Sequence, residues 1–284
     1  MFMSFSSQCQ EKPRHSPRLP CLSISSFQSS SHNLKARGKH QNNRSLVTPS
    51  FVLGLEFAGT ILSSPSSFHS NLKPGTRVFG GSLGSYASLI SVKPSSLHPI
   101  PDSWTFAQAA GLAATAPVSY GALITRGRLQ KGETVLIHAA AGGLGLMAVQ
   151  IAKAVGARVI ATASSSSKLA VAERFGADEC VDYSKPSWVD GIMKMTGGKG
   201  VDVVFDPVGL VDLSLKCLRQ KGRVLIVGFA GTEGKLERIA MNRVLLRQAQ
   251  LIGYVRLCSF HSLIYISQPF LLLRLYFKLS HIRV

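Results

Sequence analysis

The 284-residue chain has few acidic residues, and the shortage is greatest at its two ends. It contains 32 Lys and Arg against 14 Asp and Glu, which gives a formal net charge of +18. Residues 1–50 hold seven basic residues and one acidic residue, and residues 256–284 hold four basic residues and no acidic one. A nucleic-acid-binding domain concentrates basic charge on its folded body. The charge distribution therefore makes RNA or DNA an unlikely partner.

The sequence also lacks closely paired cysteines and long apolar runs. Its five cysteines include no CxxC pair, which argues against a structural zinc site and against a disulfide framework. The stretch that comes nearest to a membrane span, residues 263–279, is interrupted by Gln268, Pro269 and Arg274. We therefore expect no metal site, no membrane span and a reducing compartment.

Residues 1–50 are rich in Ser and basic residues and show no lasting hydrophobic period. Such a segment buries too little apolar surface to offset its ordering entropy, so we predict that it is disordered. The same composition is typical of an organellar transit peptide. Two interpretations remain open: a mitochondrial or plastid address, or a tail of a cytoplasmic protein.

The pattern of the chain changes at residue 51 and again near residue 131. Residues 51–101 contain short apolar runs separated by Gly and Pro, which predict a small antiparallel β unit, and residues 105–129 are Ala-rich and mostly helical in pattern. Six strand-length runs then alternate mostly with helical segments, at residues 134–138, 158–162, 180–182, 201–205, 223–228 and 249–253. This alternation predicts an α/β fold with a doubly wound, Rossmann-type parallel sheet.

A glycine-rich turn between the first of these strands and the next helix is the strongest functional signal. Its residues are Ala140, Gly142, Gly143, Leu144 and Gly145. In a dinucleotide-binding turn, Gly142 would let the backbone approach a pyrophosphate, and Gly145 would let the helix pack close to the strand. The free N–H groups at the start of the helix would face the phosphates. The turn therefore predicts a dinucleotide cofactor.

The end of the second strand indicates which dinucleotide is bound. An NAD site normally has Asp or Glu there, whereas this chain has Ser164, Ser165 and Lys168 and no carboxylate. Hydroxyl groups and an ammonium would bind a 2′-phosphate that a carboxylate would repel. We therefore expect NADPH in preference to NADH. The alternative interpretation is a Ser-rich helix cap followed by a solvated Lys.

Residues 51–255 resemble the zinc-independent quinone oxidoreductase (zeta-crystallin-like) branch of the medium-chain dehydrogenase/reductase superfamily. The resemblance rests on collinear motifs, which include the segments 53–59, 75–80, 149–153, 176–178, 196–202, 206–209 and 227–230. It implies that an incomplete GroES-like, β-rich catalytic domain at 51–118 precedes a Rossmann domain at 119–255. Residues 1–50 and 256–284 would be tails outside the family pattern.

The same resemblance implies an activity and further cofactor contacts. Members of this branch use NADPH to deliver hydride to a quinone or an α,β-unsaturated carbonyl. By resemblance, Tyr183 should flank the adenine-ribose end with Lys168 at the 2′-phosphate, and Val208, Gly228 and Phe229 should line the nicotinamide side. The expected partner is a small-molecule substrate.

The chain departs from the wider superfamily where the zinc enzymes bind their metal. Leu55 stands where those enzymes have a His, so we expect catalysis without metal and a structural role for Glu56. Thr115 and Ser119 are candidates for a nicotinamide or substrate contact. For Tyr120 and His138 we favour packing roles over proton donation. The catalytic residue stays unknown.

Both ends differ from the family pattern, and residues 256–284 replace the stretch that family members use for dimer pairing. We expect a chain that is truncated or altered at both ends, poorly soluble, and without the family dimer interface. Two alternatives to an active reductase stay open. One is a catalytically impaired, NADPH-binding remnant; the other is an RNA-binding protein, since some members of the family bind RNA.

Overall fold

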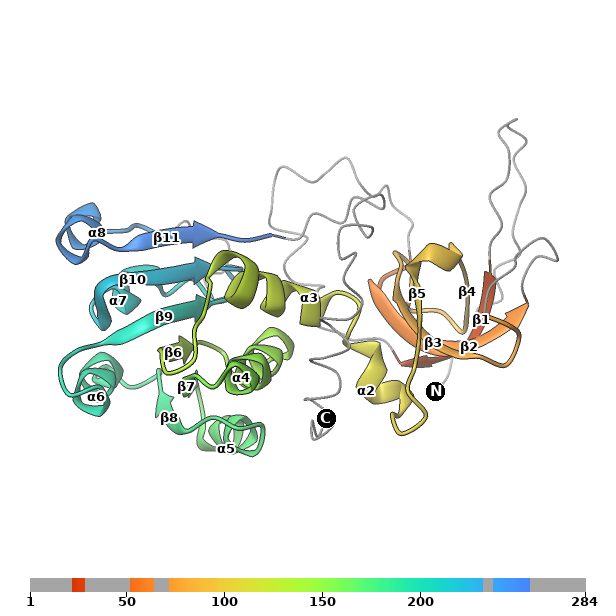
Figure 1. Ribbon diagram of the computed structural model, residues 1–284, viewed down its shortest axis with the longest axis horizontal. Coiled ribbons are helices and arrows are strands. Elements are labelled where there is room, and N and C mark those ends of the chain that lie inside the picture. The colour runs from red at the N-terminus through yellow and green to blue at the C-terminus, as the bar shows by residue number, and fades with distance from the viewer. Residues whose placement is uncertain (1–21, 29–51, 64–71, 232–236, 256–284) are drawn as a thin grey trace.

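A computed structural model describes the backbone of residues 22–28 and all atoms of residues 52–63, 72–231 and 237–255. These residues form two β-sheets, with short helices between them in the chain and in space (Figure 1). The first sheet has the strand order β4-β1-β2-β3-β5, and each pairing in it is antiparallel. Its strands are β1 (Leu22–Gln28), β2 (Glu56–Ser63), β3 (Arg77–Gly81), β4 (Leu89–Val92) and β5 (Leu97–Pro99). The predicted antiparallel unit is confirmed.

Strand β1 corrects the disorder predicted for residues 1–50. It pairs with β2 on one side and with β4 on the other, so the sheet recruits a segment from before residue 51. The Ser-rich sequence of residues 22–28 gives a weak strand pattern, but two neighbouring strands supply the hydrogen bonds that a pattern does not register. The other residues of 1–50, and all of 256–284, lie outside the described residues.

Short helical elements connect the two sheets, as the sequence predicts for residues 105–129. The 3₁₀ turn Pro94–Ser96 precedes β5, and α2 (Phe106–Ala110) starts with a capping box formed by Thr105 and Gln108. Helix α3 (Thr115–Tyr120) continues directly into a π-helix at Gly121–Arg126. In Figure 1, α3 lies between the two sheets.

The second sheet contains six parallel strands in the order β11-β10-β9-β6-β7-β8. They are β6 (Thr134–Ile137), β7 (Arg158–Ala163), β8 (Glu179–Asp182), β9 (Val201–Asp206), β10 (Leu218–Ile226) and β11 (Gln250–Gly253). The chain runs outward from β6 to β8, then returns to β9 and runs outward on the other side. The predicted doubly wound fold is confirmed, and its switch point lies between β6 and β9.

Helices cover both faces of this sheet. The helices are α4 (Gly143–Val155), α5 (Ser166–Arg174), α6 (Trp188–Met195), α7 (Val211–Ser214) and α8 (Met241–Arg247). Side chains of α4 and α5 pack in one apolar cluster, and side chains of α6 and α7 pack in another. Successive β6 residues alternate between the two: Val135 and Ile137 belong to the first cluster, and Leu136 belongs to the second. The central strands β6, β7 and β9 are therefore buried on both sides, which explains their mostly apolar sequences.

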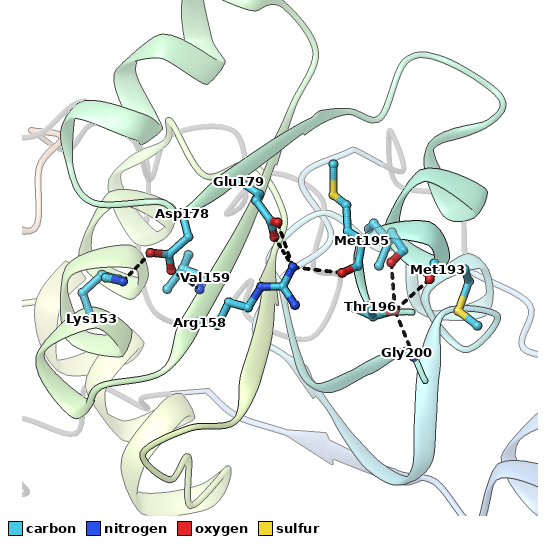
Figure 2. A network of polar contacts seen from close by, with 10 residues as sticks. Lys153, Arg158, Val159, Asp178, Glu179, Met193, Met195, Thr196 and Gly200 are labelled. Carbon is cyan, nitrogen blue, oxygen red and sulfur yellow. Dashed lines mark hydrogen bonds and ion pairs between the residues drawn. The ribbon is translucent and has the colours of Figure 1, made fainter. Parts of the chain in front are cut away.

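Charged side chains pair with one another at the amino ends of the strands. Figure 2 shows Arg158, at the start of β7, donating to the Glu179 carboxylate at 2.7 Å and to the Met195 carbonyl at 3.0 Å. Nearby, Lys153 Nζ lies 2.6 Å from Asp178 Oδ1, and Asp178 Oδ2 accepts from the Val159 amide at 2.7 Å. These contacts fix β7, β8 and the end of α6 relative to one another. None of the helices described is long and apolar enough to cross a bilayer.

Candidate functional site

The residues predicted to bind the cofactor all follow the carboxyl ends of parallel strands. The turn at residues 140–145 follows β6, residues 164–168 follow β7, Tyr183 follows β8, Val208 follows β9, and residues 228–229 follow β10. Parallel strands end at one edge of their sheet, so five segments far apart in the sequence meet along one edge. In doubly wound sheets, ligands bind at this edge, beside the switch point.

The glycine turn brings α4 unusually close to the end of β6. A Cβ at Gly145 would lie 2.3 Å from the Ala139 carbonyl oxygen and 2.6 Å from the Ala140 Cα, so only Gly fits there. A Cβ at Gly142 would lie 3.2 Å from the same oxygen, and apart from the two adjacent residues no other described atom would lie within 4 Å of it. The amide of Ala140 donates to the Thr162 carbonyl at 2.9 Å, which ties the turn to β7. Gly145 thus has the packing role that the sequence predicts.

The first turn of α4 has amide donors that the described part of the chain leaves without an acceptor. Gly142 is the N-cap residue and has no side chain to cap the helix. The first α4 residue whose amide finds a backbone acceptor is Leu146, which donates to the Gly142 carbonyl at 2.8 Å. The amides of Gly143, Leu144 and Gly145 have no partner among the described residues. Three donors at the positive end of a helix dipole form a site for an anion such as a phosphate.

Ser164, Ser165 and Lys168 lie together at the end of β7. Lys168 Nζ donates to Ser164 Oγ at 3.3 Å, and the Lys168 amide donates to Ser165 Oγ, the N-cap of α5, at 3.4 Å. Ser164 and Lys168 are exposed. Ser165 therefore has the capping role of the alternative interpretation, but Ser164 and Lys168 remain accessible to a ligand.

The other predicted contacts border the same edge. The Tyr183 amide donates to the Ala163 carbonyl at 3.1 Å, which places Tyr183 beside the end of β7. Val208 is buried, and its carbonyl accepts from the Gly231 amide at 2.9 Å. A Cβ at Gly228 would lie 3.0 Å from the Pro207 carbonyl oxygen, and Phe229 is 45% exposed. The segments after β9 and β10 therefore pack against each other. That they line the nicotinamide stays a prediction.

Asp206, to which the sequence analysis assigns no role, organises the segment after β9. Its buried carboxylate accepts hydrogen bonds from the amides of Val208, Gly209 and Leu210 at 2.8, 2.9 and 2.6 Å. An Asp that directly follows an apolar strand and precedes Pro and Gly is the signal that could have found this turn. The carboxylate fixes the backbone that carries Val208.

His138 is completely buried, and both of its ring nitrogens have hydrogen-bond partners. Nδ1 lies 2.8 Å from Thr162 Oγ1, and Nε2 lies 2.8 Å from Ser214 Oγ. Burial lowers the pKa of His138 below its ordinary value, and the charge of Asp206 offsets part of that effect. The favoured packing role is consistent with this burial, but the sequence gives no sign of Ser214, which lies 76 residues away.

Glu56 connects the first sheet to α3. Its Oε2 accepts from the amides of Ala114 and Thr115 at 2.8 and 3.2 Å, and its Oε1 accepts from Thr115 Oγ1 at 2.8 Å. Further along α3, Ser119 Oγ donates to the Leu144 carbonyl at 2.9 Å. Thr115 and Ser119, predicted as nicotinamide or substrate contacts, therefore use their hydroxyl groups to hold α3 between Glu56 and the first turn of α4.

The structure also describes the surroundings of Tyr120 and the arrangement of possible metal ligands. Tyr120 packs against the core of the second sheet, and burial raises the pKa of its phenol, which makes it a weaker proton donor. Among the described residues, no group of three or more His, Cys, Asp or Glu side chains is placed to hold a metal ion.

The fold and this edge define a class of protein: a dehydrogenase or reductase in which a smaller β-rich unit precedes a Rossmann-type unit along the chain. The family described as zinc-binding dehydrogenase matches residues 143–265. Quinone oxidoreductase-like protein 2 of Rattus norvegicus is 38% identical over 230 residues, which cover 78% of this chain and 63% of the relative. This chain therefore spans less than two thirds of the length of that relative.

Solved structures agree with this class. A probable oxidoreductase from Mycobacterium abscessus has a TM-score of 0.76 and 33% identity, and the match covers 95% of this chain and 82% of that one. Escherichia coli quinone oxidoreductase complexed with NADPH has a TM-score of 0.74 and 26% identity, with 94% and 81% covered. The chain belongs to the quinone oxidoreductase-like branch of the medium-chain dehydrogenase/reductase superfamily, as the motifs of residues 51–255 predict.

Proposed function

We propose that this chain binds NADPH along the carboxyl edge of its six-stranded sheet and reduces a quinone or an α,β-unsaturated carbonyl without a metal ion. The observation that carries the proposal is the first turn of α4, where the amides of Gly143, Leu144 and Gly145 have no acceptor among the described residues. A diphosphate accepts hydrogen bonds from such amides, and the helix dipole favours its charge.

The preference for NADPH over NADH rests on the residues after β7. The Lys168 ammonium donates a hydrogen bond to the Ser164 hydroxyl at 3.3 Å, so the two groups could bind the same phosphate. Both are exposed, and the segment 161–168 contains no carboxylate that would repel a second phosphate. NADPH complexes of related proteins, such as that of Escherichia coli quinone oxidoreductase, support the same choice of cofactor.

The protein needs few groups for the reaction itself. NADPH supplies a hydride when it is bound, and the chain has to hold it in place and shield the site from water. In this proposal, the amides of α4 bind the diphosphate, Lys168 and Ser164 bind the 2′-phosphate, and Tyr183 flanks the adenosine. Val208, Gly228 and Phe229 border the nicotinamide, with Val208 held in place by Asp206.

Metal-free catalysis fits the surroundings of β2. Leu55 has no donor atom, and the Glu56 carboxylate already accepts three hydrogen bonds from Ala114 and Thr115. A carboxylate engaged in this way holds α3 in place and is poorly placed to bind a metal ion at the same time.

The test combines a binding measurement and an assay on the full chain. NADPH and NADH are titrated by fluorescence, and NADPH oxidation is followed with a small quinone and with an enone. We expect saturable binding, tighter for NADPH, and acceptor-dependent NADPH oxidation that a chelator leaves unchanged. Tighter binding of NADH would contradict the cofactor assignment, and loss of turnover with the chelator would contradict the metal-free mechanism. Binding without turnover on any acceptor would identify a cofactor-binding protein without reductase activity.

A further inference from the structure

A buried network of hydrogen bonds connects β7, the end of β6 and α7 next to the proposed cofactor edge. His138 follows β6 directly, and its imidazole lies between the Thr162 hydroxyl of β7 and the Ser214 hydroxyl of α7, 2.8 Å from each. Ser214 Oγ in turn donates to the Leu210 carbonyl at 2.7 Å. All four residues are at least partly buried. The side chain of His138 thereby joins one segment on each side of its own strand.

The direction of these hydrogen bonds assigns the proton on the ring. Ser214 has a single hydroxyl proton, and its short contact to the Leu210 carbonyl uses it, so Ser214 Oγ accepts from His138 Nε2–H. His138 Nδ1 is then unprotonated and accepts from the Thr162 hydroxyl. The opposite tautomer would leave the Leu210 carbonyl without this donor and turn the Thr162 hydroxyl toward the Ile137 carbonyl, 3.5 Å away. Only the Nε2–H form uses all three short contacts.

The two residues at the ends of this hydrogen-bond network, Thr162 and Leu210, lie next to different halves of the proposed cofactor edge. Thr162 lies two residues before Ser164, and its carbonyl accepts from Ala140 of the glycine turn at 2.9 Å. Leu210 ends the segment whose amides bind the Asp206 carboxylate and which carries Val208. The imidazole therefore connects the adenosine side to the nicotinamide side.

Aromatic rings hold the imidazole in place. The Trp188 ring meets it edge-on with centroids 5.4 Å apart, and the Tyr183 ring does so at 6.4 Å. With no exposed surface, the ring cannot turn away from its two hydroxyl partners without losing this packing. A rigid, fully hydrogen-bonded group can set a distance between two segments in a way that an apolar side chain cannot.

We infer that His138, as the neutral Nε2–H tautomer, is a positioning residue that fixes the segment 206–210 against the end of β7 and thereby sets the span between the adenosine side and the nicotinamide side of the proposed cofactor edge. The inference rests on the proposed function because the span matters only to a ligand that reaches both sides. His138 itself touches neither substrate nor cofactor.

The tautomer is tested without any ligand. Long-range ¹H–¹⁵N spectra of the chain labelled at histidine are compared with those of the His138→Gln variant, which identifies the His138 signals. We expect a protonated Nε2 and an unprotonated Nδ1 at neutral pH, and a change in this pattern in Ser214→Ala. A protonated Nδ1 in the unmodified chain would overturn the inference.

The positioning role is tested with two ligands of different reach. NADPH would reach both sides of the proposed cofactor edge, whereas 2′-phospho-ADP-ribose lacks the nicotinamide and would reach only the adenosine side. For Ser214→Ala we expect the Kd for NADPH to rise roughly five- to tenfold, about the effect of one lost hydrogen bond, and the Kd for 2′-phospho-ADP-ribose to change less than about twofold. Thr162→Val should weaken both ligands, and Thr162→Ser, which keeps the hydroxyl, should restore both affinities.

The control is Thr196→Val at the opposite end of the sheet, where the Thr196 hydroxyl contacts the Met193 carbonyl and the Gly200 amide (Figure 2). It should lower the melting temperature and leave both Kd values unchanged. Equal weakening of both ligands by Ser214→Ala, or no weakening, would overturn the positioning role. Absence of NADPH binding by the unmodified chain would instead overturn the proposed function, and the spectra would still decide the tautomer.

Discussion

The two ends of the six-stranded sheet differ in whether their polar groups find partners within the protein. At the amino ends of the strands, charged side chains pair with each other: Lys153 with Asp178, Arg158 with Glu179, Arg219 with Asp202 and Arg223 with Glu133. At the carboxyl ends, the amides of the first turn of α4 have no acceptor in the described part of the chain, and Lys168 has a hydroxyl partner and no carboxylate. The charged side chains at the amino end thus pair mostly with one another, although Arg223 Nε has no partner among the described residues. The carboxyl end has the Arg243–Asp212 ion pair, but the first turn of α4 and Lys168 are suited to an external anion.

Because of this difference, we expect folding stability to depend on the amino end of the sheet and cofactor affinity to depend on the carboxyl end. A closed network holds secondary structure together, so its loss should lower the free energy of unfolding. Open donors add little to folding, so their loss should lower affinity and leave the fold intact. Variants at the two ends of the sheet therefore test this difference.

The largest effect is expected at Gly145, where packing and binding coincide. In Gly145→Ala, the new Cβ would meet the backbone of Ala139 and Ala140 and push α4 away from the turn. We expect the free energy of unfolding to fall by about 1–3 kcal/mol and NADPH affinity to fall at least about tenfold, measured by urea denaturation and fluorescence titration.

Two glycines serve as controls for that variant. A Cβ at Gly191, within α6, would meet no heavy atom within 4 Å outside its own helix, so Gly191→Ala should be stabilising by about 0.5–1 kcal/mol without effect on binding. Gly142→Ala should lower affinity with little loss of stability. Unchanged binding in Gly145→Ala would contradict the assignment of the turn.

The next effect belongs to Lys168 alone. Lys168→Ala should weaken NADPH roughly 10- to 100-fold, the range for a hydrogen bond to a charged group, and leave NADH affinity and the melting temperature unchanged. Lys194→Ala, an exposed Lys of α6, is the matched control and should change nothing. Equal weakening of NADPH and NADH would show that Lys168 does not recognise the 2′-phosphate.

Arg158 tests the opposite end. Arg158→Met removes the contacts to Glu179 and to the Met195 carbonyl, and we expect it to lower the free energy of unfolding by about 1 kcal/mol because both partners are partly exposed. NADPH affinity should stay within twofold of the unmodified chain. A large loss of affinity would mean that the amino end of the sheet influences NADPH binding at the carboxyl end, which would contradict the proposed separation.

A pH dependence of stability is expected at His138. Burial lowers the pKa of the folded-state imidazole, with Asp206 offsetting part of the shift, whereas the unfolded chain titrates near 6.5. Below that pH the unfolded state binds a proton that the folded state excludes, so stability should fall on acidification, by at most about 1.4 kcal/mol per pH unit. Urea denaturation at pH 7.5 and 5.5 should show a steeper loss for the unmodified chain than for His138→Gln. Equal slopes would contradict the shift.

The sequence predicts the six-stranded sheet well because its central strands β6, β7 and β9 are mostly apolar and almost completely buried. It predicts the glycine turn for the same local reason: strand, Gly residues and helix follow one another directly. Strand β1 is not predicted, since its apolar–polar alternation at residues 22–25 is short and lies in a Ser-rich segment, and only the pairing with β2 and β4 reveals it.

The contacts that hold the site together also escape a sequence-based prediction. Glu56 binds Ala114 and Thr115 across 58 and 59 residues, and His138 reaches Ser214 across 76. Such pairs depend on how two segments pack, and no local spacing reveals them. Asp206 is the exception, because its turn is formed within four residues.

The most direct test of the account is a crystal structure of the chain with NADPH. We expect diphosphate oxygens within hydrogen-bonding distance of the amides of Gly143, Leu144 and Gly145, and the 2′-phosphate beside Ser164 and Lys168. NADPH bound elsewhere, or a side chain of the protein occupying the first turn of α4 in its place, would contradict it.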